Sequence, residues 1–188
     1  MVTLHIKNMV CDRCITTVEQ TLTKLEVPFE KVVLGNAFLT TAIDDIDIDL
    51  LDAELQAAGF ELIRDKKQKF VEDIKNIIVD FIHYSDDKDM KINFSDYLSE
   101  KLNKDYSYIS GVFSELEKIT IEKYIILHKV ERVKELISYD NLNFSEIAYR
   151  LNYSSIAHLS GQFKRVTDLT LSQYKDSAYE LRKSLDKI

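Results

Sequence analysis

The sequence predicts an α+β protein in which a small mixed domain precedes a larger all-α domain. The chain of 188 residues is long enough for two small domains. It contains only 4 Gly and 1 Pro, which disfavours a fold rich in tight turns and favours helices. Residues 1–65 carry 12 acidic and 5 basic side chains, whereas the remainder is balanced, and the hydrophobic pattern changes at the same point. We therefore predict a domain boundary near Asp65.

The first part alternates between the two hydrophobic periods. Period-two patterns predict strands at 3–6, 31–36, 37–42 and 60–63. Helical periodicity predicts helices at 12–26 and 47–58, the second with Leu50, Leu51 and Leu55 as its apolar residues. Gly35-Asn36 is a good tight-turn pair, so it should join the two middle strands. The resulting order is βαββαβ, the ferredoxin-like arrangement.

The second part has helical periodicity throughout. Helices are predicted at 66–84, 93–102, 107–117, 120–138, 143–151, 155–166 and 170–185, with a polar loop at 84–91. Three segments recur: N-F-S-D at 93–96 with N-F-S-E at 143–146, L-N at 102 and 151, and S-G-V-F with S-G-Q-F at 110 and 160. Each copy is a short helix, a turn and a second helix, an arrangement that commonly puts a helix into a DNA groove.

Cys11 and Cys14 are the only cysteines, and they lie between the first predicted strand and helix. In a reducing compartment this spacing favours metal or redox chemistry over a structural disulfide. A helix N-terminus stabilises a thiolate, so Cys14 should ionise readily. Two thiolates satisfy linear Cu(I), whereas Zn(II) normally takes four ligands and would need a second subunit here. A redox pair, buried thiols, and a domain kept only for dimerisation remain alternatives.

Residues 1–65 resemble the heavy-metal-associated domain of copper chaperones and metal-transporting ATPases. The family motif M-x-C-x-x-C matches Met9 through Cys14, and the family's aromatic residue after an Ala-Gly pair matches Phe60. The resemblance implies that Cys11 and Cys14 bind the metal and that Met9 and Phe60 support the site. It favours Cu(I), with Zn(II) or Cd(II) as other soft or borderline ions. The family's G-M-T-C is N-M-V-C here, which keeps both ligands.

Residues 66–188 resemble the DNA-binding domain of the AraC family of transcription regulators. The second copy carries the resemblance in three segments: S-E-I-A-Y-R-L-N-Y-S-S at 145–155, L-S-G-Q-F-K-R at 159–165 and T-L-S-Q-Y at 170–174. The resemblance implies two helix-turn-helix units, at about 93–118 and 143–167, whose second helices enter adjacent major grooves of double-stranded DNA.

The chain departs from that family at its common base-reading arginine, which is replaced by Gly111 and Gly161. An arginine there discriminates by about 1–3 kcal/mol per base pair, so weaker or different base reading is expected. The remaining candidates for DNA contact are Ser107, Tyr108, Ser110 and Ser114 in the first copy and Ser155, Ala157, His158, Ser160 and Gln162 in the second. Lys104, Lys164 and Arg165 are candidates for phosphate contacts.

Together the two parts predict a metal-responsive transcription regulator. The helix at 66–84 follows the metal domain directly, so it is the element expected to couple metal binding to DNA binding. A metal shared between two subunits would form a homodimer and double the DNA contacts. Two other functions stay open: a metal chaperone or buffer whose helical part docks a protein partner, and a thiol-redox regulator. The repeat could also be a relic used for protein contacts.

Several classes are disfavoured by missing motifs. The chain has no glycine-rich phosphate loop, nucleophile elbow or H-E-x-x-H segment, so we do not expect an enzyme. No apolar run is long enough to span a membrane, and the first residues lack the pattern of a signal peptide. The expected location is the cytoplasm.

Overall fold

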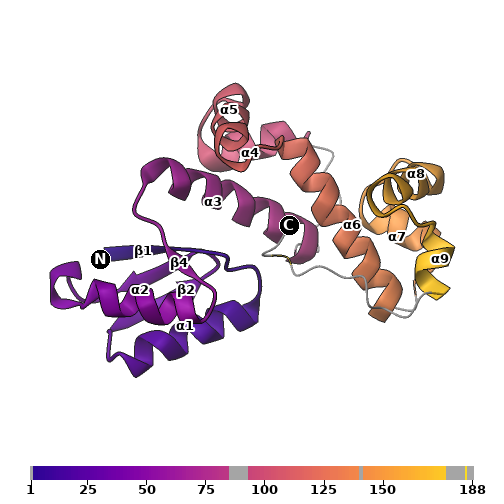
Figure 1. Ribbon diagram of the computed structural model, residues 1–188. Coiled ribbons are helices and arrows are strands. Elements are labelled where there is room, and N and C mark those ends of the chain that lie inside the picture. The colour runs from indigo at the N-terminus through magenta and orange to yellow at the C-terminus, as the bar shows by residue number, and fades with distance from the viewer. Residues whose placement is uncertain (1, 85–92, 140–141, 177–184, 186–188) are drawn as a thin grey trace. The chain divides into compact units, whose positions relative to one another are not determined.

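The computed structural model in Figure 1 describes residues 2–84, 93–139, 142–176 and 185. Contacts within the chain divide it into two compact units, residues 1–76 and 77–188. The division falls inside helix α3 (Lys66–Val79), which begins directly after the boundary near Asp65 that the charge pattern predicts. The first part of α3, through Asn76, therefore belongs to the N-terminal unit.

The N-terminal unit has the βαββαβ order that the sequence predicts, with one short 3₁₀ helix added. Its elements are β1 (Val2–Lys7), α1 (Asp12–Lys24), β2 (Phe29–Val33), β3 (Asn36–Leu39), η1 (Ile43–Asp45), α2 (Ile48–Ala57) and β4 (Glu61–Leu62). Helix α2 begins after Asp47, whose carboxylate accepts a hydrogen bond from the Leu50 N–H at 3.0 Å. An aspartate in this position satisfies one of the amide groups left unpaired at a helix start.

The four strands form an antiparallel sheet in the order β2-β3-β1-β4. In the central strand β1, Val2 lies opposite Leu39 of β3, and Ile6 lies opposite Leu62 of β4. Helices α1 and α2 contact each other, and Figure 1 shows them side by side along the strands. Each of these helices therefore connects two strands that are separated by a third strand.

The turn between β2 and β3 lies one residue earlier than predicted. Leu34 and Gly35 form the turn, and Gly35 has φ +78°, a conformation that favours glycine. Asn36 is not in the turn but begins β3, opposite Val33, and its side-chain oxygen lies 2.7 Å from the His5 ring nitrogen. The pairing of Asn36 with two neighbouring strands outweighs its preference for turns.

The core of the N-terminal unit lies between the sheet and the two helices. Alternate residues of β1, Leu4 and Ile6, are buried, and they join Leu51 and Leu55 of α2 in one hydrophobic cluster. Leu50, the third apolar residue predicted for this helix, is instead 49% exposed. Its position in the first turn of α2 directs it away from the sheet, so only two of the three leucines contribute to the core.

The C-terminal unit consists of helices wherever it is described. After the last residues of α3 it contains a π-helix, η2 (Asp80–Tyr84), then α4 (Phe94–Leu102), α5 (Tyr106–Glu117), α6 (Ile121–Tyr139), α7 (Phe144–Arg150), α8 (Ile156–Thr167) and α9 (Leu171–Asp176). Tyr84, which we predicted to begin a loop, ends the π-helix because the apolar pattern of α3 continues to that point. The rest of that loop and the predicted helix beyond Asp176 lie outside the described residues.

The two halves of the C-terminal unit repeat the same internal contacts. Phe113 of α5 packs edge-on against Tyr124 of α6, with ring centroids 5.4 Å apart. Phe163 of α8 packs in the same way against Tyr174 of α9, at 5.5 Å. An asparagine side chain caps the first helix of each pair. The repeat predicted from the sequence is therefore confirmed as a structural repeat.

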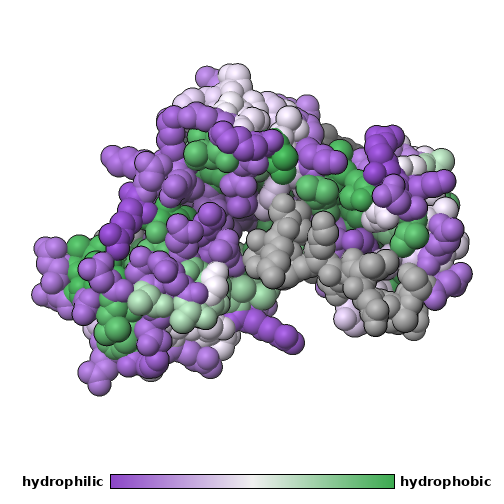
Figure 2. Space-filling view, in the orientation of Figure 1, coloured by the Kyte–Doolittle hydropathy of each residue, from purple (hydrophilic) through white to green (hydrophobic). Residues whose placement is uncertain are grey.

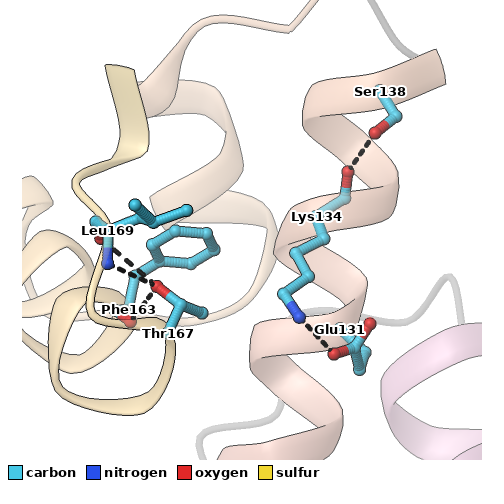
Figure 3. Close-up of polar contacts among 6 residues, drawn as sticks. All are labelled: Glu131, Lys134, Ser138, Phe163, Thr167 and Leu169. Atoms are coloured by element: carbon cyan, nitrogen blue, oxygen red, sulfur yellow. Dashed lines mark hydrogen bonds and ion pairs between the residues drawn. The ribbon is translucent and has the colours of Figure 1, made fainter. Parts of the chain in front are cut away.

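Hydrogen bonds fix the last turn of α8, and a buried ion pair lies within α6. Figure 3 shows the Thr167 hydroxyl donating to the Phe163 carbonyl at 2.8 Å and accepting from the Leu169 N–H at 3.2 Å. In α6, the Lys134 ammonium lies 2.6 Å from the buried Glu131 carboxylate (Figure 3). The threonine thus links the last turn of α8 to the segment that enters α9. Among the described residues, no helix is long and apolar enough to cross a membrane.

Candidate functional site

The two cysteines lie together at the start of α1. Cys11 is the extended residue that precedes the helix, and Cys14 lies in its first turn, where its N–H donates to the Cys11 carbonyl at 2.9 Å. The two Sγ atoms are 3.4 Å apart, and both residues are partly exposed. The predicted pair is therefore within reach of a single ion or of disulfide formation.

The thiol of Cys14 does not behave as the sequence predicts. Burial raises the pKa of Cys14, and this effect outweighs the hydrogen bond from the Val10 backbone, which lowers it. We expected the helix N-terminus to favour the thiolate, but Cys14 packs against the hydrophobic core of the unit. Desolvation disfavours a charged sulfur, so burial opposes ionisation of Cys14.

The two residues predicted to support a metal site are buried in that same core. Met9 is 1% exposed and Phe60 is 7% exposed, and Cys14 packs against the cluster that contains both. Between Met9 and β1 stands Asn8, with φ +71°. Met9 and Phe60 thus belong to the apolar cluster against which Cys14 packs.

The pair suits an ion that accepts few ligands. Among the residues that the structure describes, no group of three or more His, Cys, Asp or Glu side chains is arranged to hold a metal. With bonds of about 2.3 Å to sulfur, linear coordination needs sulfurs roughly 4.6 Å apart, and tetrahedral angles need roughly 3.8 Å. Both values exceed the 3.4 Å in the structure, so the sulfurs would have to separate to hold one ion between them.

The predicted DNA-contact residues gather on two helices. Those of the first copy lie on α5, and those of the second lie on α8 or, for Ser155, immediately before it. The exposed members are Ser107, Tyr108, Gly111, Ser155, Ala157, His158, Gly161, Lys164 and Arg165. The half-buried members are Ser110, Ser114, Ser160 and Gln162. Each set therefore lies on the second helix of its pair, as the helix-turn-helix prediction requires.

Several of these side chains already have partners inside the unit. The Ser155 hydroxyl accepts from the His158 N–H at 3.1 Å and so caps α8. The Gln162 side-chain oxygen accepts from the Tyr153 hydroxyl at 2.7 Å. The Ser154 hydroxyl lies 3.0 Å from Nδ1 of His158 and orients that ring. Ser155 thus has a structural role that its assignment as a DNA contact did not include.

The surface over α5 is largely of intermediate hydropathy (Figure 2), and the helix has no lysine or arginine of its own. Figure 2, which has the orientation of Figure 1, shows it mostly in near-white tones rather than the deep purple of strongly hydrophilic residues. The exposed cations nearest in sequence are Lys104 before α5 and Lys118 after it, whereas α8 carries Lys164 and Arg165 in its last turn. The second helix of the second pair therefore carries more basic side chains that could contact DNA phosphates than the second helix of the first pair.

Two polar contacts that position these helices were missed in the sequence. The Lys129 ammonium of α6 donates to the Leu151 carbonyl at the end of α7, at 3.0 Å, and lies over the Tyr153 ring. The Tyr106 hydroxyl of α5 donates to the Glu122 carboxylate of α6 at 2.6 Å. Neither pair has a local sequence signal, because its partners are 22 and 16 residues apart.

Comparison with known proteins identifies the helical part. The family model described as a helix-turn-helix domain matches residues 98–177. The C-terminal domain of AraT, a response regulator from Geobacillus stearothermophilus, is similar with a TM-score of 0.51 at 20% identity, covering 64% of this chain and 92% of that chain. The C-terminal domain of the two-component response regulator yesN from Fusobacterium nucleatum has a TM-score of 0.48 at 28% identity, covering 55% and 95%.

No curated protein matches the chain in sequence. The family model covers α5 to α9 and most of α4, so it includes the second helices of both pairs. The likeness to the AraT domain shows the fold of that domain in this chain. Residues 98–177 therefore form a helix-turn-helix domain.

Proposed function

We propose that the chain is a DNA-binding transcription regulator of the AraC type. The observation that carries the proposal is the repeated helix pair, matched over residues 98–177 by a helix-turn-helix family. Its exposed faces on α5 and α8 hold the residues assigned to DNA contact. Helices presented in this way enter major grooves, where side chains meet base edges and phosphates.

The input of this regulator is a soft metal ion bound by Cys11 and Cys14. Their sulfurs are close together and partly exposed, and the described residues offer no third ligand. Two thiolates suit Cu(I), which is therefore favoured; Zn(II) or Cd(II) would need ligands from a second chain, which implies a homodimer. The strand order β2-β3-β1-β4 supports the ferredoxin-like arrangement expected of a heavy-metal-associated domain.

A thiol-redox regulator is the second candidate, because the two sulfurs, now 3.4 Å apart, need to approach by only about 1.4 Å to form a bond of about 2.05 Å. Mild oxidation of the metal-free chain, followed by mass measurement and DNA binding, separates this function from metal sensing. A metal chaperone or buffer would bind metal and a protein partner, but it would show no specific binding to double-stranded DNA.

Two measurements on the reduced full-length chain test the metal-responsive regulator. Anaerobic titration with Cu(I), Zn(II) and Cd(II) against a competing chelator gives the affinity and the stoichiometry. Selection from random duplexes, followed by affinity measurement at one fixed salt concentration, gives the operator and the effect of metal. We expect Cu(I) to change DNA affinity by about 5- to 150-fold, the usual range for coupled sites.

The matched control is the double variant Cys11→Ser, Cys14→Ser. It should lose Cu(I) binding and should bind the selected duplex with an affinity that no longer depends on metal. An undiminished metal response in this variant would refute the assignment of the cysteines. Failure to select any duplex, with metal affinity intact, would instead favour the chaperone or buffer.

A further inference from the structure

Asn8 connects the cysteine pair to two other parts of the N-terminal unit. Its carbonyl accepts a weak hydrogen bond from the Cys14 thiol, with the sulfur at 4.0 Å. Its side-chain amide donates to the Gly59 carbonyl at 3.1 Å, next to Phe60. Its backbone N–H donates to the Glu72 carboxylate of α3 at 3.3 Å. One residue thus contacts the cysteine site, the turn between α2 and β4, and the helix that leaves the unit.

Glu72 is a buried acid that needs these partners. It is 7% exposed, and its second oxygen lies 3.5 Å from the Lys75 ammonium. Burying a carboxylate costs free energy unless the carboxylate is paired and hydrogen-bonded. The backbone N–H of Asn8 and the Lys75 ammonium together provide these contacts for Glu72. A change in the position of Asn8 therefore changes the free energy of docking this part of α3.

Binding of one ion by both cysteines requires their sulfurs to separate. The Sγ atoms of Cys11 and Cys14 are closer than two sulfur–metal bonds allow, as shown above. Cys14 is held within the first turn of α1 by its backbone hydrogen bond and by core contacts. Cys11 precedes the helix and, unlike Cys14, does not pack against the core cluster, so the displacement falls on Cys11, three residues after Asn8.

We propose that the hydrogen bond between Asn8 and Glu72 transmits the state of the cysteine pair to α3. This inference rests on the proposed metal input and names the residues that communicate it. Glu72 acts through Asn8 and is therefore a positioning residue. Because α3 is one continuous helix from Lys66 to Val79, a change in its docking at Glu72 reaches the segment that enters the C-terminal unit.

Residue-resolved hydrogen exchange of the full-length chain, with and without Cu(I), tests this inference. We expect Cu(I) to change exchange at the Asn8 amide and along α3 by about fivefold or more, since exchange reports local opening. Glu72→Ala should abolish the α3 response while leaving Cu(I) affinity unchanged. Glu72→Gln keeps an oxygen acceptor for the Asn8 amide and should retain the response. Gln68→Ala, an exposed change on the same helix, is the matched control.

Each other outcome overturns the proposal. An unaltered α3 response in Glu72→Ala would mean that the coupling takes another route. The same conclusion follows if Cu(I) changes hydrogen exchange along α3 of the wild-type chain but not at the backbone amide of Asn8. This comparison does not depend on any variant. Tight Cu(I) binding without any change in α3 would refute this inference alone, whereas absence of Cu(I) binding in the titration would refute the proposed metal input as well.

Discussion

The hydrogen bond from Tyr106 to Glu122 links the first turn of α5, in the first helix pair, to α6, which follows that pair. Tyr106 is half-buried, and burial together with the neighbouring carboxylate raises the pKa of its hydroxyl. The same hydrogen bond lowers the pKa of the Glu122 carboxyl below its ordinary value of 4.5. A contact between these two residues therefore contributes most when Glu122 is ionised.

This contact predicts how acid affects the first pair. Because the folded-state pKa of Glu122 is lowered, its stabilisation is present above the ordinary pKa and is lost as pH falls through the folded-state value. Tyr106→Phe should lower the free energy of unfolding by about 0.5–1 kcal/mol at pH 7, a value reduced for solvent screening at this mostly exposed carboxyl. The difference should shrink at more acidic pH.

An NMR titration of the Glu122 carboxyl in both chains measures the cause directly. The pKa should rise toward 4.5 in Tyr106→Phe. Tyr149→Phe, at an 82% exposed tyrosine of α7, is the control and should leave the titration unchanged. An identical Glu122 pKa in wild type and Tyr106→Phe would rule out the hydroxyl as its cause.

At the scale of an element, α8 is a helix with a glycine in its middle. Gly161 is exposed, and a Cβ added there would meet no atom within 4 Å; the same holds for Gly111 of α5. Neither glycine has a positive φ. Both positions can therefore accept a side chain without rearrangement, although glycine in a helix interior costs about 0.8–1 kcal/mol relative to alanine.

Restoring an arginine at this position should strengthen DNA binding. Gly161→Arg adds a cation on the exposed face of α8, next to Lys164 and Arg165, and removes a helix-weakening residue. A bidentate contact to guanine is worth about 1–3 kcal/mol, or about 5- to 150-fold in affinity for duplexes with guanine at the facing position. Gly161→Ala separates helix stabilisation from charge. Equal affinities of the two variants, measured at one salt concentration, would exclude a role for this position in DNA contact.

At the scale of the whole molecule, helix α3 is shared by the two units. Its residues through Asn76 belong to the first unit, and its last residues, through Val79, belong to the second. Its docking in the N-terminal unit involves a close approach of backbone and side chain. A Cβ at Gly35, in the turn between β2 and β3, would collide with the Asn76 side chain. Glycine at position 35 is thus favoured both by its φ of +78° and by the nearness of the Asn76 side chain.

Gly35→Ala should therefore loosen α3. The left-handed conformation alone costs a non-glycine residue about 1–2 kcal/mol, and the collision adds to this value. Combining Gly35→Ala with Asn76→Ala should remove the collision but not the backbone cost, so the two changes should be non-additive. Hydrogen exchange along α3 is the measurement. Strict additivity of the single and double variants would show that Gly35 and Asn76 are not in contact.

Local pattern was enough to predict most elements of this protein. Strands and helices follow hydrophobic periods of 2 and 3.6, so the βαββαβ order and the helix pairs were predicted to within a few residues at most ends. The internal repeat and the Cys11–Cys14 pair are likewise visible in the chain itself. Their chemistry as a metal site stays a prediction, as do the DNA contacts on α5 and α8.

Tertiary structure decided what depends on burial and on residues distant in sequence. The pKa of Cys14 rises because the core covers the thiol, although its place at a helix start predicted the opposite. Asn36 leaves the turn because two strands pair with it. The bonds of Asn8 to Glu72 and of Lys129 to Leu151 join residues 64 and 22 positions apart. Such contacts form only when separate elements dock, since no local period encodes which polar groups a folded core brings together.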